Sequence, residues 1–376
     1  MKRGTDVIVV GGGAIGLSTA WELAQQGVSV RVIDRGRCGR EASWAGAGMI
    51  IPGNSLKAAT PEARLRAMSF ELWSGVSEKL LASTGVDNEF KRCGGLEVCF
   101  EENVSQLDAA VERWRTEGVD VEPLSARDLF LAEKAINPEL AGGYQLPAMS
   151  QIRNPRHLRA LQLACQELGV QFEEEDPVVG FAREENRVTG VQAKSGTFTA
   201  DQVCVCAGAW TRQLLNETGF GFEIEPVRGQ MVMLKCSPLP FRHIVQSGAQ
   251  YIVPRSDGRA LVGSTEERVG FEKRTTAAGV SGLLQFGVSV IPQLADATVE
   301  RTWSGLRPGS PNGVPYLGLV GDFTNLFVAA GHFRCGLQNS PATGRLLREL
   351  ILGQPACLDP QDFVPAAVQS DVLTAS

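Results

Sequence analysis

The chain has 376 residues, of which 43% are hydrophobic and 21% are charged, which is enough for a large core and for two domains. Its formal net charge of −6 argues against nucleic acid or an anionic membrane surface as a partner. No apolar stretch approaches the roughly 18 residues that a membrane-spanning helix needs. The first residues do not follow the pattern of a signal peptide, so we expect a cytoplasmic protein.

The cysteines and histidines argue against a metal site. The nine cysteines include no CxxC pair, and the three histidines, His157, His243 and His332, are not spaced as a ligand set. Reduced thiols in a cytosolic protein are a simpler interpretation of these cysteines than a disulfide framework. We expect no metal ion.

The chain begins with a complete β–α–β unit. Residues 6–10 are apolar and β-branched, as in a buried strand, and residues 14–26 carry apolar side chains at helical spacing. Gly27 lies where that helix should end, and residues 28–33 form a second strand-like run. Two strands joined by a helix predict a parallel sheet.

The later elements come from distant parts of the chain. Periodicity and turn residues predict further elements, with helices over 61–84, 104–114, 156–168 and 341–352 and strands over 188–193, 197–199, 203–206 and 326–330. Ser340 is the expected N-cap of the last helix. Between about 220 and 300 strands dominate, with one helix after Ala278. We expect one sheet assembled from both ends and the middle, and a second domain inserted in two pieces.

A glycine-rich turn follows the first strand. Gly11, Gly13 and Gly16 fit the GxGxxG fingerprint of dinucleotide-binding proteins, in which the glycines permit a tight turn, close approach of a pyrophosphate and tight helix–strand packing. The N-terminus of the following helix attracts phosphate, and Asp34 ends the second strand where a ribose hydroxyl needs an acceptor. Alternatively, the glycines serve packing only. The fingerprint does not distinguish FAD from NAD.

Five motifs in order resemble one family. They are VIVVGGGAIGLSTAWELAQQG near the start, EASWAGAGMI, VCVCAGAW, GLRPGSPNGVPYLG and GHFRCG. Together they resemble the D-amino-acid oxidase superfamily of FAD-dependent amine oxidoreductases, most closely its glycine oxidase branch, which serves thiamine biosynthesis. The resemblance implies an α/β fold: a Rossmann-like FAD-binding domain of the glutathione-reductase type, and an α+β substrate domain on a largely antiparallel sheet. We assign residues 1–85, 150–218 and 300–376 to the first domain and 86–149 and 219–299 to the second.

The resemblance also implies which positions bind FAD. Beside the fingerprint these are Ala14 and Ile15 at the pyrophosphate, Asp34 and Arg35 at the ribose, Ala42 and Ser43 at the phosphates, Ala47, Gly48 and Met49 at the isoalloxazine ring, Val178 at the adenine, Ala207 and Gly208 at the AMP, and His332, Phe333, Arg334, Cys335, Gly336, Leu337 and Gln338 at the pyrimidine edge. A glycine-rich loop entering a helix suits the last group, because its N–H groups stabilise negative charge on a reduced flavin.

Four residues are candidates for the substrate. A planar guanidinium matches a carboxylate better than an ammonium does, and the resemblance makes Arg307 the main carboxylate clamp and Arg334 a second substrate-region arginine. Tyr251 matches a tyrosine whose hydroxyl contacts the substrate. Glu266 lies where the family has an apolar methionine. Its carboxylate would either pair with the substrate ammonium or point at solvent.

In the family, a hydride passes from the substrate α-carbon to flavin N5 without a protein acid or base, and oxygen receives the electrons. This implies oxidation of glycine, sarcosine or small D-amino acids to imine or glyoxylate, ammonia and hydrogen peroxide. We expect noncovalent FAD, because no cysteine lies near Arg307, and a structural role for His332. Relatives are often tetramers, so a homo-oligomer is expected. The alternatives are a dehydrogenase that passes electrons to a quinone or partner subunit, and a noncatalytic flavin-binding subunit.

Overall fold

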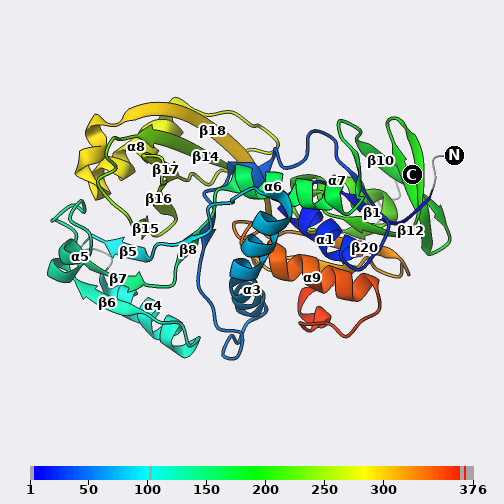
Figure 1. Cartoon of the computed structure of the whole chain (residues 1–376), viewed down its shortest axis with the longest axis horizontal. Helices are drawn as coiled ribbons and strands as arrows, with labels where there is room; N and C mark the ends of the chain where they lie inside the picture. Colours follow the sequence, from blue (N-terminus) through cyan, green and yellow to red (C-terminus); the bar gives the residue numbers. More distant parts are fainter. Residues whose placement is uncertain (1–3, 101–103, 365–367, 370–376) are drawn as a thin grey trace, which may run out of the picture.

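Two eight-stranded β-sheets organise the protein, which we describe from a computed structural model covering residues 4–100, 104–364 and 368–369. Figure 1 shows the two sheets at opposite ends of the long axis, with helix α3 (Pro61–Thr84) between them. The first sheet leads into the glycine-rich turn, and the second holds two of the four residues expected to bind substrate, Tyr251 and Arg307.

The first sheet has a parallel centre. Its parallel strands lie in the order β20–β12–β1–β2–β9, with β19 antiparallel beside β20 and the β10–β11 hairpin extending from β12. The bounds are β1 Thr5–Val10, β2 Val30–Ile33, β9 Gln171–Glu173, β10 Val178–Glu184, β11 Arg187–Ala193, β12 Gly196–Val205, β19 Tyr316–Leu319 and β20 Leu326–Ala330. The sheet thus joins strands from both ends and the middle of the chain, as predicted.

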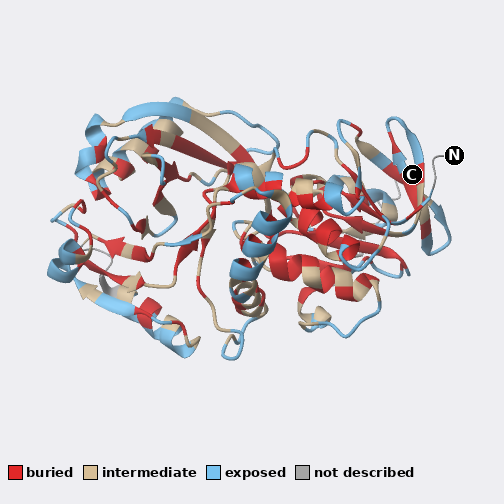
Figure 2. Cartoon of the chain, viewed as in Figure 1, coloured by how far each residue is buried: buried red, intermediate tan, exposed pale blue. Residues whose placement is uncertain are grey.

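Alternating side chains of β1 enter two different cores. Val7 and Val9 pack against the helical layer, whereas Ile8 and Val10 pack toward the β10–β11 side. Because successive side chains of a strand point to opposite faces, one short apolar run serves both cores. The helices on the first face are α1 Ala14–Ala24, α3, α6 Asn154–Glu167 and α9 Ser340–Ile351. In Figure 2, buried residues concentrate in α1 and α9.

The second sheet is antiparallel except for one strand pair. Its order is β18–β14–β17–β16–β15–β5–β7–β6, and only the pairing of β15 with β5 is parallel among the described residues. The bounds are β5 Gly95–Cys99, β6 Glu122–Ser125, β7 Gly142–Leu146, β14 Glu225–Lys235, β15 Ile244–Ser247, β16 Gln250–Pro254, β17 Arg259–Gly263 and β18 Thr298–Gly309. The predicted fold class, a Rossmann-like domain with a largely antiparallel second sheet, is therefore confirmed.

Shorter elements complete the fold. These are α2 Ala42–Ala45, α4 Val104–Thr116, α5 Ala126–Ala132, α7 Thr211–Leu215 and α8 Ala277–Val290, the small sheet of β3 Met49–Ile50, β4 Lys91–Arg92 and β8 Ser150–Gln151, and the pair β13 Phe220–Gly221 and β21 Val368–Gln369. The last helix begins one residue earlier than predicted, so Asn339 and not Ser340 is its N-cap. The residue bounds of the two domains stay a prediction.

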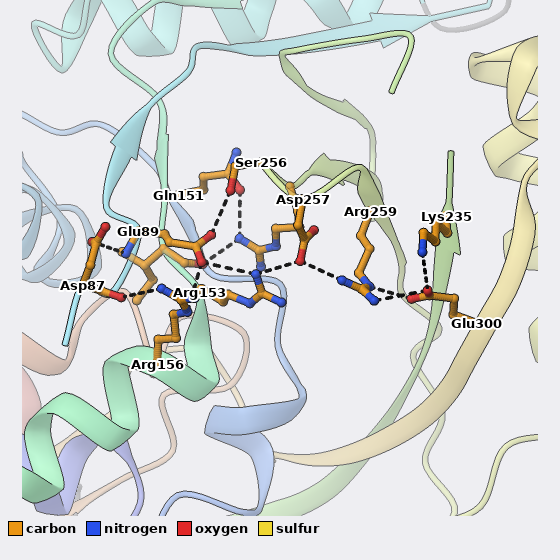
Figure 3. A network of polar contacts seen from close by, with 12 residues as sticks. Asp87, Glu89, Gln151, Arg153, Arg156, Lys235, Ser256, Asp257, Arg259 and Glu300 are labelled. Carbon is orange, nitrogen blue, oxygen red and sulfur yellow. Dashed lines mark hydrogen bonds and ion pairs between the residues drawn. The ribbon is translucent and has the colours of Figure 1, made fainter. Parts of the chain in front are cut away.

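Ion pairs connect the two halves (Figure 3). Arg153, which precedes α6, contacts Asp257 in the β16–β17 turn at 2.9 Å. Asp257 also pairs with Arg259 at 2.8 Å, and Arg259 pairs with Glu300 of β18 at 2.5 Å. The chain of contacts therefore runs from a helix of the parallel sheet to two strands of the antiparallel sheet. Such partly exposed pairs contribute little each, but together they restrict how the halves sit.

Two further predictions concern absent features. In the part of the chain that the structure describes, no helix combines the length and apolarity needed to cross a membrane. Nor do three or more His, Cys, Asp or Glu side chains gather in that part as a metal site would require.

Candidate active site

A cavity of about 770 Å³ runs between the two sheets. One end is formed where β1, β2, β12 and β20 finish, and the other is lined by residues of β14, β16 and β18. Ligands of open parallel sheets bind at this carboxyl edge. Every residue predicted to bind cofactor or substrate lines this cavity, except Gly16.

The glycine-rich turn packs tightly against neighbouring backbone. Gly11 has φ +108°, and a Cβ there would overlap the Cys206 carbonyl group. A Cβ on Gly16 would overlap the Gly11 carbonyl oxygen. Gly16 therefore lets α1 begin against β1, and its contribution to a dinucleotide site is the position of the helix N-terminus, which attracts phosphate.

Two side chains hold this turn in place. The carboxylate of Asp34 accepts hydrogen bonds from the Gly12 N–H at 2.7 Å and the Gly36 N–H at 2.8 Å. Ser43 Oγ accepts from the Ala14 N–H at 2.9 Å. Burial raises the pKa of Asp34, and the two N–H groups oppose part of that rise. Asp34 thus positions the turn in addition to its predicted role as a ribose acceptor.

The part of the cavity predicted to hold adenine is partly aromatic. The Arg35 guanidinium lies 3.9 Å from the centroid of the Trp210 ring. Trp210 stacks in turn on Phe271, with centroids 5.5 Å apart. Val178 and Gly208 line the cavity beside them. Trp210 was not among the predicted site residues, although it stands inside the VCVCAGAW motif.

The loop between β20 and α9 also lines the cavity. Phe333, with φ +48°, donates its N–H to the Pro308 carbonyl group at 2.9 Å. Gln338 donates from Nε2 to the Ile51 carbonyl group at 2.7 Å, and its own carbonyl group accepts from Trp73 Nε1 at 2.9 Å. These bonds fix both ends of the loop predicted to contact the flavin pyrimidine edge.

His332 is buried, and one of its ring nitrogens contacts a side chain of α9. Its Nε2 lies 3.1 Å from Thr343 Oγ1 on α9. Burial lowers the pKa of His332 to about 3, so the imidazole is neutral at neutral pH and binds a proton weakly. This environment supports the predicted structural role.

Arg307 and Tyr251 both line the cavity, as expected of residues that bind substrate. Arg307 donates from Nη1 to the Thr265 carbonyl group at 3.0 Å and from Nη2 to Ser264 Oγ. Tyr251 donates its hydroxyl proton to Met231 Sδ at 3.4 Å. Both partners of Arg307 are neutral, so its charge is free to meet a carboxylate.

The space for Arg307 depends on a glycine. Gly229 of β14 lies beside it, and a Cβ there would overlap the guanidinium group. Ser264, Thr265 and Gly229 were not predicted from sequence, because no local pattern marks a residue that merely holds an arginine from a neighbouring strand.

Glu266 pairs with Arg334, a partner that neither expectation for its carboxylate had named. Arg334 Nη2 donates to Glu266 Oε2, and both side chains line the cavity. The side chains remain 48% exposed for Arg334 and 31% for Glu266. Two of the four residues predicted to bind substrate, Arg334 and Glu266, thus form an ion pair with each other.

A buried arginine absent from the predictions supports the wall beside Met49. Arg255 donates to the Ala47 carbonyl group from Nη2 and to the Ile152 carbonyl group from Nη1, both at 2.8 Å. Burial lowers the pKa of Arg255 to about 10, which keeps it charged at neutral pH. The sequence YIVPR contained this residue but held no signal that separated it from a surface arginine.

These walls fit FAD. A long cavity with a helix N-terminus, the acidic Asp34 at one end and the small residues Ala47 and Gly48 at the other suits a dinucleotide whose second half is a broad ring. Gly11 and Gly13 line the cavity without a side chain, which leaves room for a phosphate beside the backbone.

Comparison with known proteins agrees with this geometry. A family model described as FAD dependent oxidoreductase matches residues 6–350. The glycine oxidase of Pseudomonas putida is 38% identical over 364 residues, covering 96% of this chain and 98% of that protein. The bifunctional protein ThiO/ThiG of Synechocystis sp. is 33% identical over 94% of this chain and 52% of that protein. The crystal structure of glycine oxidase from Geobacillus kaustophilus has a TM-score of 0.92 and 31% identity, covering 96% of this chain and 98% of that one.

Fold, cavity and comparisons define an FAD-dependent oxidoreductase. The chain belongs to the FAD-dependent oxidoreductase family that contains the D-amino-acid and glycine oxidases. The predicted family, the enzyme class of FAD-dependent amino-acid oxidases and the cofactor FAD are thereby confirmed.

Proposed function

We propose that this enzyme oxidises glycine, and also accepts sarcosine and small D-amino acids. The products are an imine that hydrolyses to glyoxylate and ammonia when glycine is the substrate, and hydrogen peroxide from oxygen. The observation that carries the proposal is the arginine at the substrate end: Arg307 faces the cavity held by neutral groups only. The relatives named glycine oxidase support glycine as the substrate.

Arg307 supplies orientation. Its planar fork matches both oxygens of an α-carboxylate, and the Thr265 and Ser264 acceptors hold the guanidinium while it does so. Tyr251 lies on β16 of the same sheet. Its hydroxyl group donates a hydrogen bond to Met231 Sδ, and a thioether sulfur is a weak acceptor. A substrate carboxylate is the stronger acceptor, so we expect this hydroxyl to turn to it.

The chemistry that FAD supplies when bound is acceptance of a hydride from the substrate α-carbon at flavin N5, followed by electron transfer to oxygen. The neutral, buried His332 does not serve as the base for this step. The chain contributes binding and orientation, which account for a large share of catalysis when two reactants are held in place.

Anaerobic mixing with glycine tests the proposal. We expect the flavin absorbance to bleach, and peroxide to form when air is admitted. Bleaching with slow reoxidation by oxygen supports the alternative dehydrogenase that uses a quinone or a partner subunit. Failure of glycine, sarcosine, N-ethylglycine, D-alanine and D-proline to bleach the flavin would contradict both and leave a noncatalytic subunit.

Three further features remain predictions that we carry as part of the proposal. The FAD is noncovalent, the protein forms a homo-oligomer, and its product enters the thiazole branch of thiamine biosynthesis in the cytoplasm. The similarity to the ThiO/ThiG protein supports the last of these.

A further inference from the structure

Three consecutive residues hold both arginines of the substrate end. Ser264 and Thr265 accept hydrogen bonds from Arg307, and Glu266 accepts from Arg334. The two arginines therefore differ in their partners. One is held by a hydroxyl and a carbonyl group, which are neutral, and the other by a carboxylate.

The two arginines also come from adjacent stretches of backbone. Phe333, next to Arg334, donates its N–H to the carbonyl group of Pro308, next to Arg307, at 2.9 Å. Both side chains line the same cavity. A ligand that reaches Arg307 consequently lies in the field of Arg334, unless the charge of Arg334 is offset.

Glu266 offsets that charge. Among the described residues, no carboxylate forms an ion pair with Arg307, whereas Arg334 pairs with Glu266. Glu266 in turn lies 3.9 Å from Arg268, which is bonded at 2.8 Å to Glu225 outside the cavity. The substrate end thus presents one arginine whose charge no protein carboxylate offsets, which matches one carboxylate.

We infer that Glu266 determines selectivity: by neutralising Arg334, it restricts this site to amino acids with a single carboxylate. The inference rests on the proposed function and names its substrate class more narrowly. Without the Glu266 carboxylate, Arg334 is free to bind a second carboxylate, and the site accepts amino diacids. Glu266 acts through Arg334, so it is a positioning residue for that cation.

Two probes of similar size separate charge from bulk. Iminodiacetate is glycine with an N-carboxymethyl group, and N-ethylglycine is an analogue without the second carboxylate. The wild-type enzyme should have the higher kcat/KM for N-ethylglycine. In Glu266→Gln the ratio of kcat/KM for iminodiacetate to that for N-ethylglycine should rise about two- to fivefold, the upper part of the range for a partly exposed charge pair. The gain should shrink as ionic strength rises, because salt screens an exposed cation.

Two variants control the measurement. Glu225→Gln removes the same charge from a residue outside the cavity wall and should leave the ratio unchanged. Adding Arg334→Gln to Glu266→Gln should return the ratio toward its wild-type value, since the second cation is then gone. Flavin absorbance shows that each variant has folded around its cofactor.

Several outcomes would overturn the inference. They are an unchanged ratio in Glu266→Gln, a gain that survives removal of Arg334, or a wild-type enzyme that already prefers iminodiacetate to N-ethylglycine. The last comparison needs no variant, so it holds even if Glu266→Gln does not fold. Wild-type turnover of glycine tests the proposed function separately, so a failure of selectivity is distinguishable from a failure of the reaction.

Discussion

Gly229→Ala should disable the substrate end while leaving the fold intact. A Cβ at this position would lie 2.5 Å from Cζ of Arg307 and closer still to its two terminal nitrogens. Ordinary contact needs about 3.5 Å between such atoms, so the guanidinium must move by roughly 1 Å. The atoms displaced are the far end of a flexible side chain, so we expect a change in unfolding free energy below about 1 kcal/mol.

The kinetic cost should be much larger. A displacement of about 1 Å in a positioning group costs on the order of 100-fold in rate, or about 2.7 kcal/mol of transition-state stabilisation. The assay is steady-state peroxide formation with glycine, together with flavin content and a thermal melt for each protein. Gly282→Ala is the matched control, because this exposed glycine of α8 has nothing within 4 Å of an added Cβ. If Gly229→Ala keeps wild-type kcat/KM with full flavin content, then Arg307 is not the clamp that we infer.

Other regions of the structure make equally direct predictions. Gly16→Val should abolish FAD binding and lower the melting temperature, because its Cβ meets backbone of Gly11 and not a movable side chain; wild-type flavin content in the purified variant would contradict this. Acid precipitation should release all the yellow colour into the supernatant, whereas colour retained in the pellet would mean a covalent flavin. His332 has a folded pKa of about 3, below its ordinary value near 6.5. The unfolded state therefore binds more protons below pH 6.5, and stability falls as pH drops from there toward 3. Thermal melts across this window should show a shallower fall for His332→Gln, and an equal slope in both proteins would refute the assignment.

The residues proposed for the cofactor and those proposed for the substrate differ. We predict that the turn at Gly11 and the carboxylate of Asp34 bind the cofactor, and that Arg307, Tyr251 and Glu266 act on the substrate; all five line the same cavity. Variants at the substrate end should therefore change KM and the substrate ratio without loss of flavin. This separation lets flavin content serve as the folding control for the variants at Gly229, Glu266 and Arg334.

Much of the cofactor half was predictable because its constraints are local. The strand before Gly11, the turn and the helix after it are specified within a few residues, since a Cβ at Gly11 or Gly16 meets backbone nearby. The apolar runs of β1 and β20 likewise predict burial wherever they pack. The helix over 61–84 was predicted with the bounds that the structure has, because Pro61 and Gly85 mark its two ends.

The substrate half required tertiary structure. Sequence patterns and family resemblance identified Arg307 and Arg334 as candidates. Whether each arginine can bind a substrate carboxylate depends on its hydrogen-bond partners, which are distant along the chain. Glu266 is 68 residues from Arg334, and Arg255 reaches Ala47 across 208 residues. Such pairs form only when distant strands and loops pack together. No short sequence pattern therefore predicts them. By itself, the sequence determined a dinucleotide turn and the family of the chain, while packing decided which arginine keeps an unpaired charge for the substrate.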